Sequence, residues 1–218
     1  MTSTNRCRWW PTKWVPRVVK LADAAGRGRS RLASSAVIDP SVRIHETAIV
    51  ESGATIGAGS SVWHHSHVRD GAVIGDGCVL GKNVYIDTQA RVGARCKIQN
   101  NVSVYHGVTI EDDVFIGPAA TFTNDRVPRA FNDEWQITPT RIRTGASIGA
   151  NATVVCGHTV GEFAMVAAGA TVTREVAAHE LVGGTPLRHL GWVCRCGVSV
   201  SRAERLPDDV VCTRCAAG

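Results

Sequence analysis

Four cysteines lie close together near the end of the chain. Cys194 and Cys196 form one pair, Cys212 and Cys215 form a second, and a stretch of fifteen residues separates the pairs. Four thiolates at such spacing are typical of a small structural zinc site, in which tetrahedral Zn²⁺ keeps no open coordination position. The first pair is C-x-C rather than the commoner C-x-x-C, and disulfides are the alternative. We therefore predict a zinc-ribbon-like tail with four cysteine ligands over residues 193–218.

A second group of polar residues recurs at a fixed interval of three hexads. Asp70, Thr88, His106 and Asn124 each stand two positions after an aliphatic or aromatic residue. If one turn of the fold takes three hexads, these side chains lie one above another. The imidazole of His106 suits general-base work near neutral pH. The side-chain carbonyl of Asn124 can accept a hydrogen bond from an amine, although an amide cannot take the proton. Outer residues of such a fold are usually polar for solubility alone, so the column by itself is weak evidence for a site.

The spacing of the apolar residues indicates a turn of that length. Ile, Leu, Val or Phe occupies every sixth position from Ile38 to Phe122 and again from Ile142 to Val172, which makes 21 hexads. A period of six does not fit an α-helix, whereas a short strand plus a turn does fit it, and a hexapeptide repeat is typical of a parallel β-helix. Three hexads make one triangular coil. We therefore predict an all-β fold of about seven coils over residues 37–192.

The hexad rhythm is interrupted once. Phe122 and Ile142 are twenty positions apart where a hexad needs six, so the chain has a surplus of fourteen residues here, which leave the coil within an extended loop over residues 124–141. Long loops in compact domains are more often functional than idle, and a tolerated surface insertion is the alternative. Because the break begins at Asn124, the last member of the polar column, we predict that the loop encloses a site there.

The residues around the break resemble a known family. "KIQNNVSVY" (97–105), "EDDVFIGP" (111–118), "FTN" (122–124) and "PR" (128–129) stand here in the same order as in N-acetyltransferases that act on nucleotide-linked 3-amino sugars. The resemblance covers about residues 36–192. That family includes enzymes acting on UDP-linked 2-acetamido-3-amino-glucuronates and on dTDP-linked 3-amino-deoxyhexoses. The resemblance implies a left-handed β-helix, a homotrimer, and acetyl-CoA as co-substrate in the grooves between subunits. The expected reaction is acetylation of the 3-amino group of a nucleotide-linked sugar, and the same chemistry on another acceptor is the alternative.

The resemblance also implies roles for individual residues. The resemblance gives Asn124 of "FTN" the orienting catalytic role, in which its side-chain carbonyl accepts a hydrogen bond from the sugar amine. His106, one coil earlier in the polar column, is the alternative base, and a solvated or substrate-contacting histidine is the other possibility. The residues expected to contact the sugar or its diphosphate are Gln99, Asn100, Tyr105, Arg129 and His67. The residues expected to contact acetyl-CoA are His158, Ala168 and Arg188. Arginine suits a CoA phosphate because its guanidinium can form paired hydrogen bonds, while a structural His158 bonded to backbone is the alternative.

Charge and composition limit the other functions. The chain carries a net charge of +5, and residues 1–36 alone carry +7, so the rest carries −2 and has no basic surface for nucleic acid. We expect residues 1–36 to be a disordered basic extension, with an arm that touches a membrane surface as the alternative. No apolar run reaches the roughly 18–20 residues that span a bilayer, and no signal peptide is recognisable. A cytoplasmic enzyme without membrane insertion is expected.

Two rival functions could use the same pattern. A zinc-dependent γ-type carbonic anhydrase also has hexad coils, but it needs three converging histidines. The interval between His64 and His106 is seven hexads, which is not a whole number of three-hexad coils, so they fall on different faces. A non-catalytic scaffold would bind through the basic arm or the cysteine tail. The "FTN" motif and the long excursion both favour an enzyme.

Overall fold

The computed structural model describes residues 36–132, 134–206 and 211–216. The predicted basic extension therefore lies, except for its last residue, outside the described residues. Within these ranges the chain forms 24 strands and one short helix, α1 (Thr213–Ala216), which makes the described part all-β. None of the helical structure in these ranges is long and apolar enough to cross a membrane.

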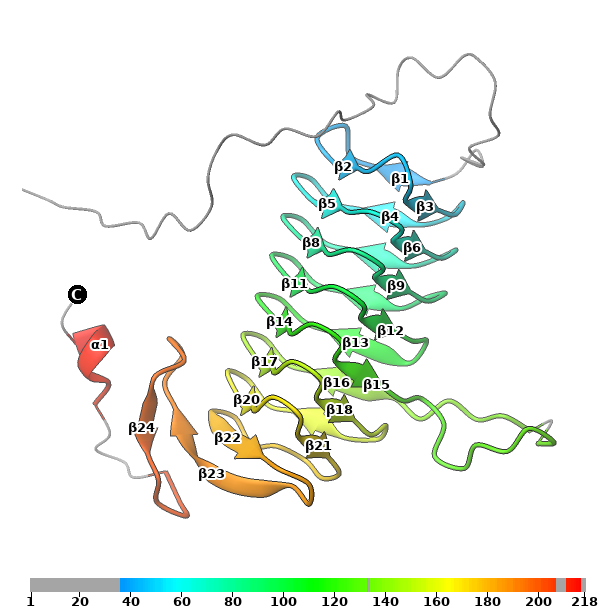
Figure 1. The fold of residues 1–218 in the computed structure, drawn as a ribbon. Coiled ribbons are helices and arrows are strands. Elements are labelled where there is room, and N and C mark those ends of the chain that lie inside the picture. Colours follow the sequence, from blue (N-terminus) through cyan, green and yellow to red (C-terminus); the bar gives the residue numbers. More distant parts are fainter. Residues whose placement is uncertain (1–35, 133, 207–210, 217–218) are drawn as a thin grey trace, which may run out of the picture.

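The first 21 strands form three flat faces of a parallel coil (Figure 1). The first face consists of β1 (Val37–Ile38), β4 (Thr55–Ile56), β7 (Val73–Ile74), β10 (Arg91–Val92), β13 (Val108–Ile110), β16 (Thr140–Ile142) and β19 (Thr159–Val160). The second face contains β2 (Arg43–Ile44), β5 (Ser61–Val62), β8 (Val79–Leu80), β11 (Lys97–Ile98), β14 (Phe115–Ile116), β17 (Ser147–Ile148) and β20 (Met165–Val166). The third face contains β3 (Ile49–Val50), β6 (His67–Val68), β9 (Tyr85–Ile86), β12 (Ser103–Val104), β15 (Thr121–Phe122), β18 (Thr153–Val154) and β21 (Thr171–Val172).

The register of these faces confirms the coil of three hexads. Ile38 pairs with Ile56 and Ile98 pairs with Ile116, each one coil apart and in parallel. The second residue of nearly every short strand points inward, and these aliphatic side chains form the buried core. Burial of each such side chain contributes about 1.5–3 kcal/mol, so the repeated column supplies most of the stability. The predicted parallel β-helix of hexapeptide repeats is confirmed, and its architecture agrees with the left-handed form.

The interruption keeps the register of the coil. Thr121 pairs with Thr153 and Phe122 pairs with Val154. Paired residues are therefore 32 positions apart in the sequence here, fourteen more than the 18 of a regular coil. The strands stop at the end of β15 and resume at the start of β16, which places the excursion at residues 123–139. We call this segment the excursion loop. It projects sideways from the stack of coils (Figure 1).

An eighth coil begins after the hexads end. Strand β22 (Glu180–Gly183) adds to the second face in parallel with β20, and Val166 pairs with Val182. This interval is two positions shorter than three hexads, so counting in sixes does not detect it. Strands β23 (Arg188–Val193) and β24 (Ser199–Ser201) then extend this face in antiparallel order. Because β23 runs through the boundary predicted between residues 192 and 193, the cysteine tail begins as a continuation of the sheet.

Candidate active site at the corner of the third and first faces

The two predicted catalytic residues lie at the corner that joins the third face to the first. Asn124 follows β15, and His106 follows β12 one coil earlier. The Nδ2 amide of Asn124 donates a hydrogen bond to the backbone carbonyl of His106 at 3.2 Å. This bond fixes the orientation of the amide and leaves Oδ1 of Asn124 available, since no described residue donates a hydrogen bond to it. We call the residues that follow the third-face strands at this corner the Asn124 corner.

Both ends of the excursion loop are anchored beside Asn124. The N–H of Thr138 donates to the carbonyl of Asn124 at 2.9 Å, and the N–H of Thr140 donates to the carbonyl of Gly107 at 3.0 Å. Gly107 has a φ of +91°, a conformation that favours glycine, and a side chain there would clash with the side chain of Ile137 in the returning chain. The loop therefore leaves and rejoins the coil next to the two predicted catalytic residues.

The largely buried carboxylate of Asp87, one coil before His106, supports the site. Oδ2 of Asp87 accepts the backbone N–H of His106 at 3.1 Å, while Oδ1 accepts the Tyr85 hydroxyl at 2.9 Å and the N–H of Thr88 at 2.8 Å. Burial alone would raise the pKa of Asp87, but the N–H groups of His106 and Thr88 and the Tyr85 hydroxyl together lower it. Asp87 is thus a hydrogen-bonded carboxylate beside the proposed site.

The same network continues to the first coil. Nη1 of Arg69 donates to the Tyr85 hydroxyl at 2.9 Å, and its Nε lies 2.8 Å from Oε1 of Glu51. His67 joins through Nε2, which lies 2.7 Å from Oε1 of Glu51. Burial alone would raise the pKa of Glu51, but the N–H of Asp70 and the side chains of Arg69 and His67 lower it. Polar side chains thus connect five successive coils along one corner.

The sequence predicts only part of this network. The structure brings four of the predicted site residues to one side of the coil, namely His67, Tyr105, His106 and Asn124. The centroid of the Tyr105 ring lies 6.1 Å from that of the Tyr85 ring, which in turn lies 5.7 Å from that of His67. The pattern did not identify Glu51, Arg69, Tyr85 and Asp87. A signal for three of them existed, because Glu51, Arg69 and Asp87 recur every three hexads in the position that directly follows an inward residue.

Two predicted substrate residues lie on a different corner. Gln99 and Asn100 follow β11, where the second face turns into the third. Oδ1 of Asn100 accepts the backbone N–H of Lys82 at 2.8 Å, one coil away. Asp76 binds the N–H of Ala58 in the same manner at 2.9 Å. Within one chain, Asn100 thus ties successive coils together and does not meet Asn124.

The remaining predicted residues are spread over the C-terminal half. Arg129 is exposed in the excursion loop and donates to the carbonyl of Pro128 at 2.8 Å. Ala168 and Arg188 are exposed, the first at the corner between the second and third faces and the second at the start of β23. His158 is largely buried, and its Nδ1 lies 3.8 Å from a carboxylate oxygen of Glu175. In the described part of one chain, the residues expected to bind acetyl-CoA do not form a single group.

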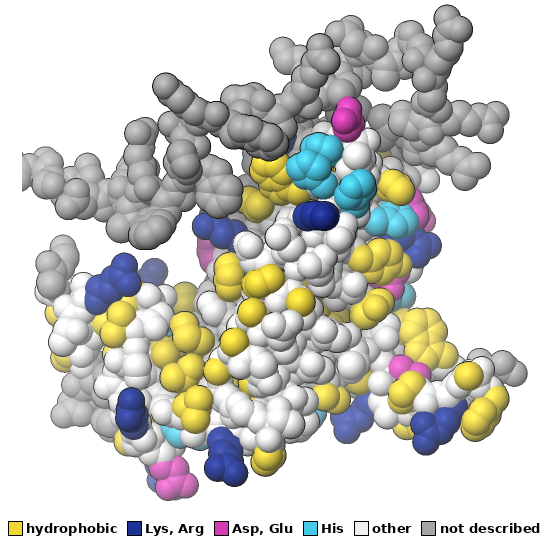
Figure 2. Space-filling model, in the orientation of Figure 1, with side chains coloured by type: hydrophobic (Ala, Val, Ile, Leu, Met, Phe, Trp, Pro, Cys, Tyr) yellow, Lys and Arg dark blue, Asp and Glu magenta, His cyan; other side chains and the backbone are white. Residues whose placement is uncertain are grey.

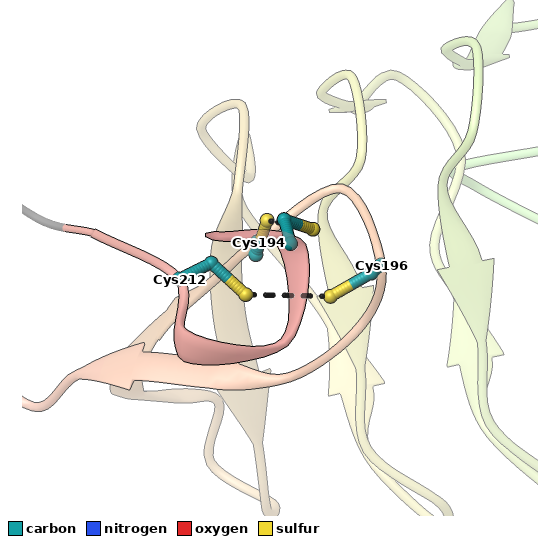
Figure 3. Close-up of side chains that lie close together, drawn as sticks. Cys194, Cys196 and Cys212 are labelled. Carbon is teal, nitrogen blue, oxygen red and sulfur yellow. Dashed lines mark hydrogen bonds between the residues drawn. The ribbon is translucent and has the colours of Figure 1, made fainter. Parts of the chain in front are cut away.

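The four tail cysteines converge on one point (Figure 3). Their sulfur atoms all lie within 4.8 Å of one another, with Sγ–Sγ distances of 3.6 Å for Cys194–Cys215 and 3.5 Å for Cys196–Cys212. A disulfide would need about 2.05 Å, so these pairs are not disulfides. Zn–S bonds of about 2.3 Å in a tetrahedron place sulfurs about 3.8 Å apart. The N–H of Cys215 is the main group that lowers the pKa of the Cys212 thiol, to about 7, whereas the three neighbouring sulfurs raise the pKa of Cys215 to about 12. The four sulfurs therefore fit a zinc site with four cysteine ligands.

The coil, its corners and its repeats define a class of protein. The chain matches the family described as bacterial transferase hexapeptide (six repeats) at residues 53–88 and 89–124. It also matches the hexapeptide repeat of succinyl-transferase at residues 71–106 and 139–174. Residues 53–124 and 139–174 thus carry the hexapeptide repeats found in bacterial transferases.

Individual relatives are similar over part of the chain. A dTDP-3-amino-3,6-dideoxy-alpha-D-galactopyranose 3-N-acetyltransferase of Aneurinibacillus thermoaerophilus is 42% identical over 73 residues, which are 34% of this chain and 36% of that protein. Serine acetyltransferase 4 of Arabidopsis thaliana is 34% identical over 96 residues, 44% of this chain and 22% of that protein. The chain thus spans about a third or less of the length of these two relatives. A hexapeptide-repeat acetyltransferase of Vibrio cholerae, solved with acetyl coenzyme A, is 30% identical, with a TM-score of 0.44 over 53% of this chain and 70% of that one.

Proposed function

We propose that this chain is an acetyl-CoA-dependent N-acetyltransferase that acylates the 3-amino group of a nucleotide-linked amino sugar. The observation that carries the proposal is the side-chain amide of Asn124, which lies at the root of the excursion loop with its Nδ2 bonded to His106. Its Oδ1 is left to accept a hydrogen bond from an incoming amine. The similarity to a 3-N-acetyltransferase of a dTDP-linked amino sugar supports the acceptor class.

The proposed reaction proceeds largely by orientation. Oδ1 of Asn124 accepts a hydrogen bond from one N–H of the neutral sugar amine, which directs the nitrogen lone pair at the thioester carbonyl. The C–N bond forms, the C–S bond breaks, and the departing thiolate of coenzyme A takes the proton that the nitrogen loses. Such positioning supplies several kcal/mol of barrier reduction. The imidazole of His106, on the neighbouring coil, is the alternative acceptor of that proton.

We propose that the active form is a homotrimer. The excursion loop carries three large apolar side chains with high exposure in the single chain, Val127 at 63%, Phe131 at 82% and Trp135 at 52% (Figure 2). Apolar groups clustered at this exposure are stabilised when another surface covers them. In a trimer the loop would pack on the neighbouring chain. That arrangement would bring Gln99, Asn100 and Ala168 of one chain toward the Asn124 corner of another, with acetyl-CoA between them.

We further propose that the four tail cysteines hold one structural zinc ion. The spacing of the sulfurs, which suits a tetrahedron, supports this assignment. With four protein ligands the metal has no open position, so it would stabilise the junction between β23 and α1 and take no part in acyl transfer.

A hydroxyl acceptor is the second candidate. The similarity to a plant serine acetyltransferase covers a longer stretch than that to the sugar enzyme, although at lower identity. The Oδ1 of Asn124 could orient a hydroxyl group as it would an amine. The two candidates therefore differ in the acceptor and not in the donor.

A direct assay distinguishes them. Purified protein is incubated with acetyl-CoA and, separately, with a dTDP- or UDP-linked 3-amino sugar, the matching 3-hydroxy sugar nucleotide, or L-serine. Release of free coenzyme A and the mass of the product are followed together. We expect a mass increase of one acetyl group only for the 3-amino sugar. Turnover of serine with no turnover of any amino sugar would overturn the proposed function.

A further inference from the structure

We infer that Asp87 is a positioning residue for the proposed reaction and that it sets the orientation of Asn124 through the backbone of His106. The inference rests on the proposed function, because Asp87 would act by orienting Asn124, the residue proposed to bind the acceptor amine. Asp87 itself does not contact Asn124 and takes no part in proton transfer.

The geometry joins the two residues through a single intermediate. Oδ2 of Asp87 accepts the N–H of His106 at 3.1 Å, and the carbonyl of His106 accepts the Nδ2 amide of Asn124 at 3.2 Å. Hydrogen bonds thus hold both polar groups of the His106 backbone. A shift of His106 would move the acceptor that orients the amide of Asn124, and with it the Oδ1 that faces the substrate.

The chemistry at Asp87 requires a carboxylate. Three donors surround it, namely the N–H of His106, the N–H of Thr88 and the hydroxyl of Tyr85, and its side chain is only 15% exposed. A carboxylate accepts through both oxygens and donates nothing. An asparagine in its place would direct N–H groups at a donor. In either orientation the amide would lose at least one of these bonds.

Arg69 determines which way the hydrogen bond between Tyr85 and Asp87 runs. Arginine can only donate, so the Tyr85 hydroxyl accepts from Nη1 of Arg69 at 2.9 Å and must use its own hydrogen to bind Asp87. A charged donor on one side and a charged acceptor on the other strengthen both bonds. Glu51 holds Arg69 in turn through Nε. The position of Asp87 is therefore supported, through Tyr85, by Arg69 and Glu51 on the two preceding coils.

Kinetics of four variants test the inference. These are Asp87→Asn, Asn124→Ala, the double variant, and Asp113→Asn as a matched control. Asp113 is bound to Arg95 at 2.6 Å on another corner of the coil. We expect Asp87→Asn to lower kcat for acetyl transfer by about 10- to 100-fold, since a misplacement of about 1 Å costs up to about 100-fold. Asp113→Asn should retain the wild-type kcat. In the Asn124→Ala background, Asp87→Asn should lower kcat by less than about threefold, because both changes remove the same orientation.

A second measurement does not depend on turnover. In ¹H–¹⁵N spectra of the purified protein, the backbone amide of His106 should move upfield in Asp87→Asn, and the side-chain amide of Asn124 should exchange faster with solvent. Tyr85→Phe, which keeps the carboxylate, should give the same changes at smaller amplitude. Unchanged His106 and Asn124 signals, or losses in kcat that multiply in the double variant, would overturn the positioning role. If the spectra change as expected but no amino sugar is acetylated by any variant, the link between Asp87 and Asn124 stands and the proposed function fails.

Discussion

Arg174 binds Glu180 through both terminal nitrogens of its guanidinium. Nη2 lies 2.8 Å from Oε1 and Nη1 lies 3.1 Å from Oε2. Glu180 is only 5% exposed, and it also accepts the N–H of Ala177 at 2.9 Å and pairs with Nδ1 of His189 at 3.0 Å. One carboxylate therefore ties the end of the regular coil to the strands that follow it, β22 and β23.

From the contacts of Glu180 we predict that the stability of the fold decreases at acid pH. Burial alone would raise the pKa of Glu180, but Arg174, the N–H of Ala177 and His189 lower it below its ordinary value of 4.5. A group whose pKa is lower in the folded state stabilises the fold above its unfolded pKa, and this contribution is lost as the pH falls through the folded pKa. We expect the free energy of urea unfolding to fall as the pH drops below the ordinary glutamate pKa of 4.5, and to fall less steeply in Glu180→Gln. Equal slopes for both proteins would contradict the assignment.

The group of four tail cysteines predicts one metal ion per chain. Elemental analysis of purified protein should find about one zinc, and Cys212→Ser should lose most of it and lower the melting temperature, because a structural metal contributes to folding directly. Cys78→Ser is the matched control, since Cys78 is buried in the coil and lies outside the tail. Metal that remains in Cys212→Ser, or disappears in Cys78→Ser, would argue against the site.

The apolar residues of the excursion loop predict the oligomeric state. Light scattering after size exclusion should give the mass of three chains for the wild-type protein and a smaller mass for Phe131→Asp, because a charge cannot be buried in the proposed interface without a partner. Leu206→Asp changes an apolar residue at 42% exposure in the tail and should leave the mass unchanged. A monomeric wild-type protein would contradict the trimer.

The last inward residue before the loop predicts a large stability effect. Phe122 is 1% exposed and is the one aromatic residue in the inward series. Phe122→Ala should lower the free energy of unfolding by about 3–5 kcal/mol, whereas Phe122→Leu should cost less than about 1.5 kcal/mol. Chemical denaturation followed by circular dichroism gives both values. A loss below about 1 kcal/mol in Phe122→Ala would mean that the coil does not depend on this contact.

The sequence predicts the coil because a period of six residues fits a parallel β-helix and does not fit an α-helix. Inward positions repeat at six from Ile38 to Phe122 and from Ile142 to Val172, and coils of three hexads place Asn124 next to His106. Counting in sixes does not predict the eighth coil, because Val182 lies sixteen positions after its partner Val166 and three hexads would need eighteen.

The support network is harder to predict for a different reason. Polar residues such as Glu51 and Asp87 are expected at any outer corner of a soluble coil, so their spacing carries little information without the contacts. The prediction that Gln99 and Asn100 contact the substrate comes from a resemblance. Within one chain their corner lies apart from that of Asn124, and only the proposed trimer would bring the two together.

In the proposed reaction, Asn124 orients the amine of a nucleotide-linked 3-amino sugar toward acetyl-CoA. Steady-state acetyl transfer to a dTDP- or UDP-linked 3-amino sugar, measured side by side for the wild-type protein and Asn124→Ala, tests it most directly. We predict that kcat falls by at least about 100-fold in a variant that keeps its oligomeric mass and melting temperature. An Asn124→Ala protein that turns over the amino sugar at the wild-type rate would rule out this role for Asn124.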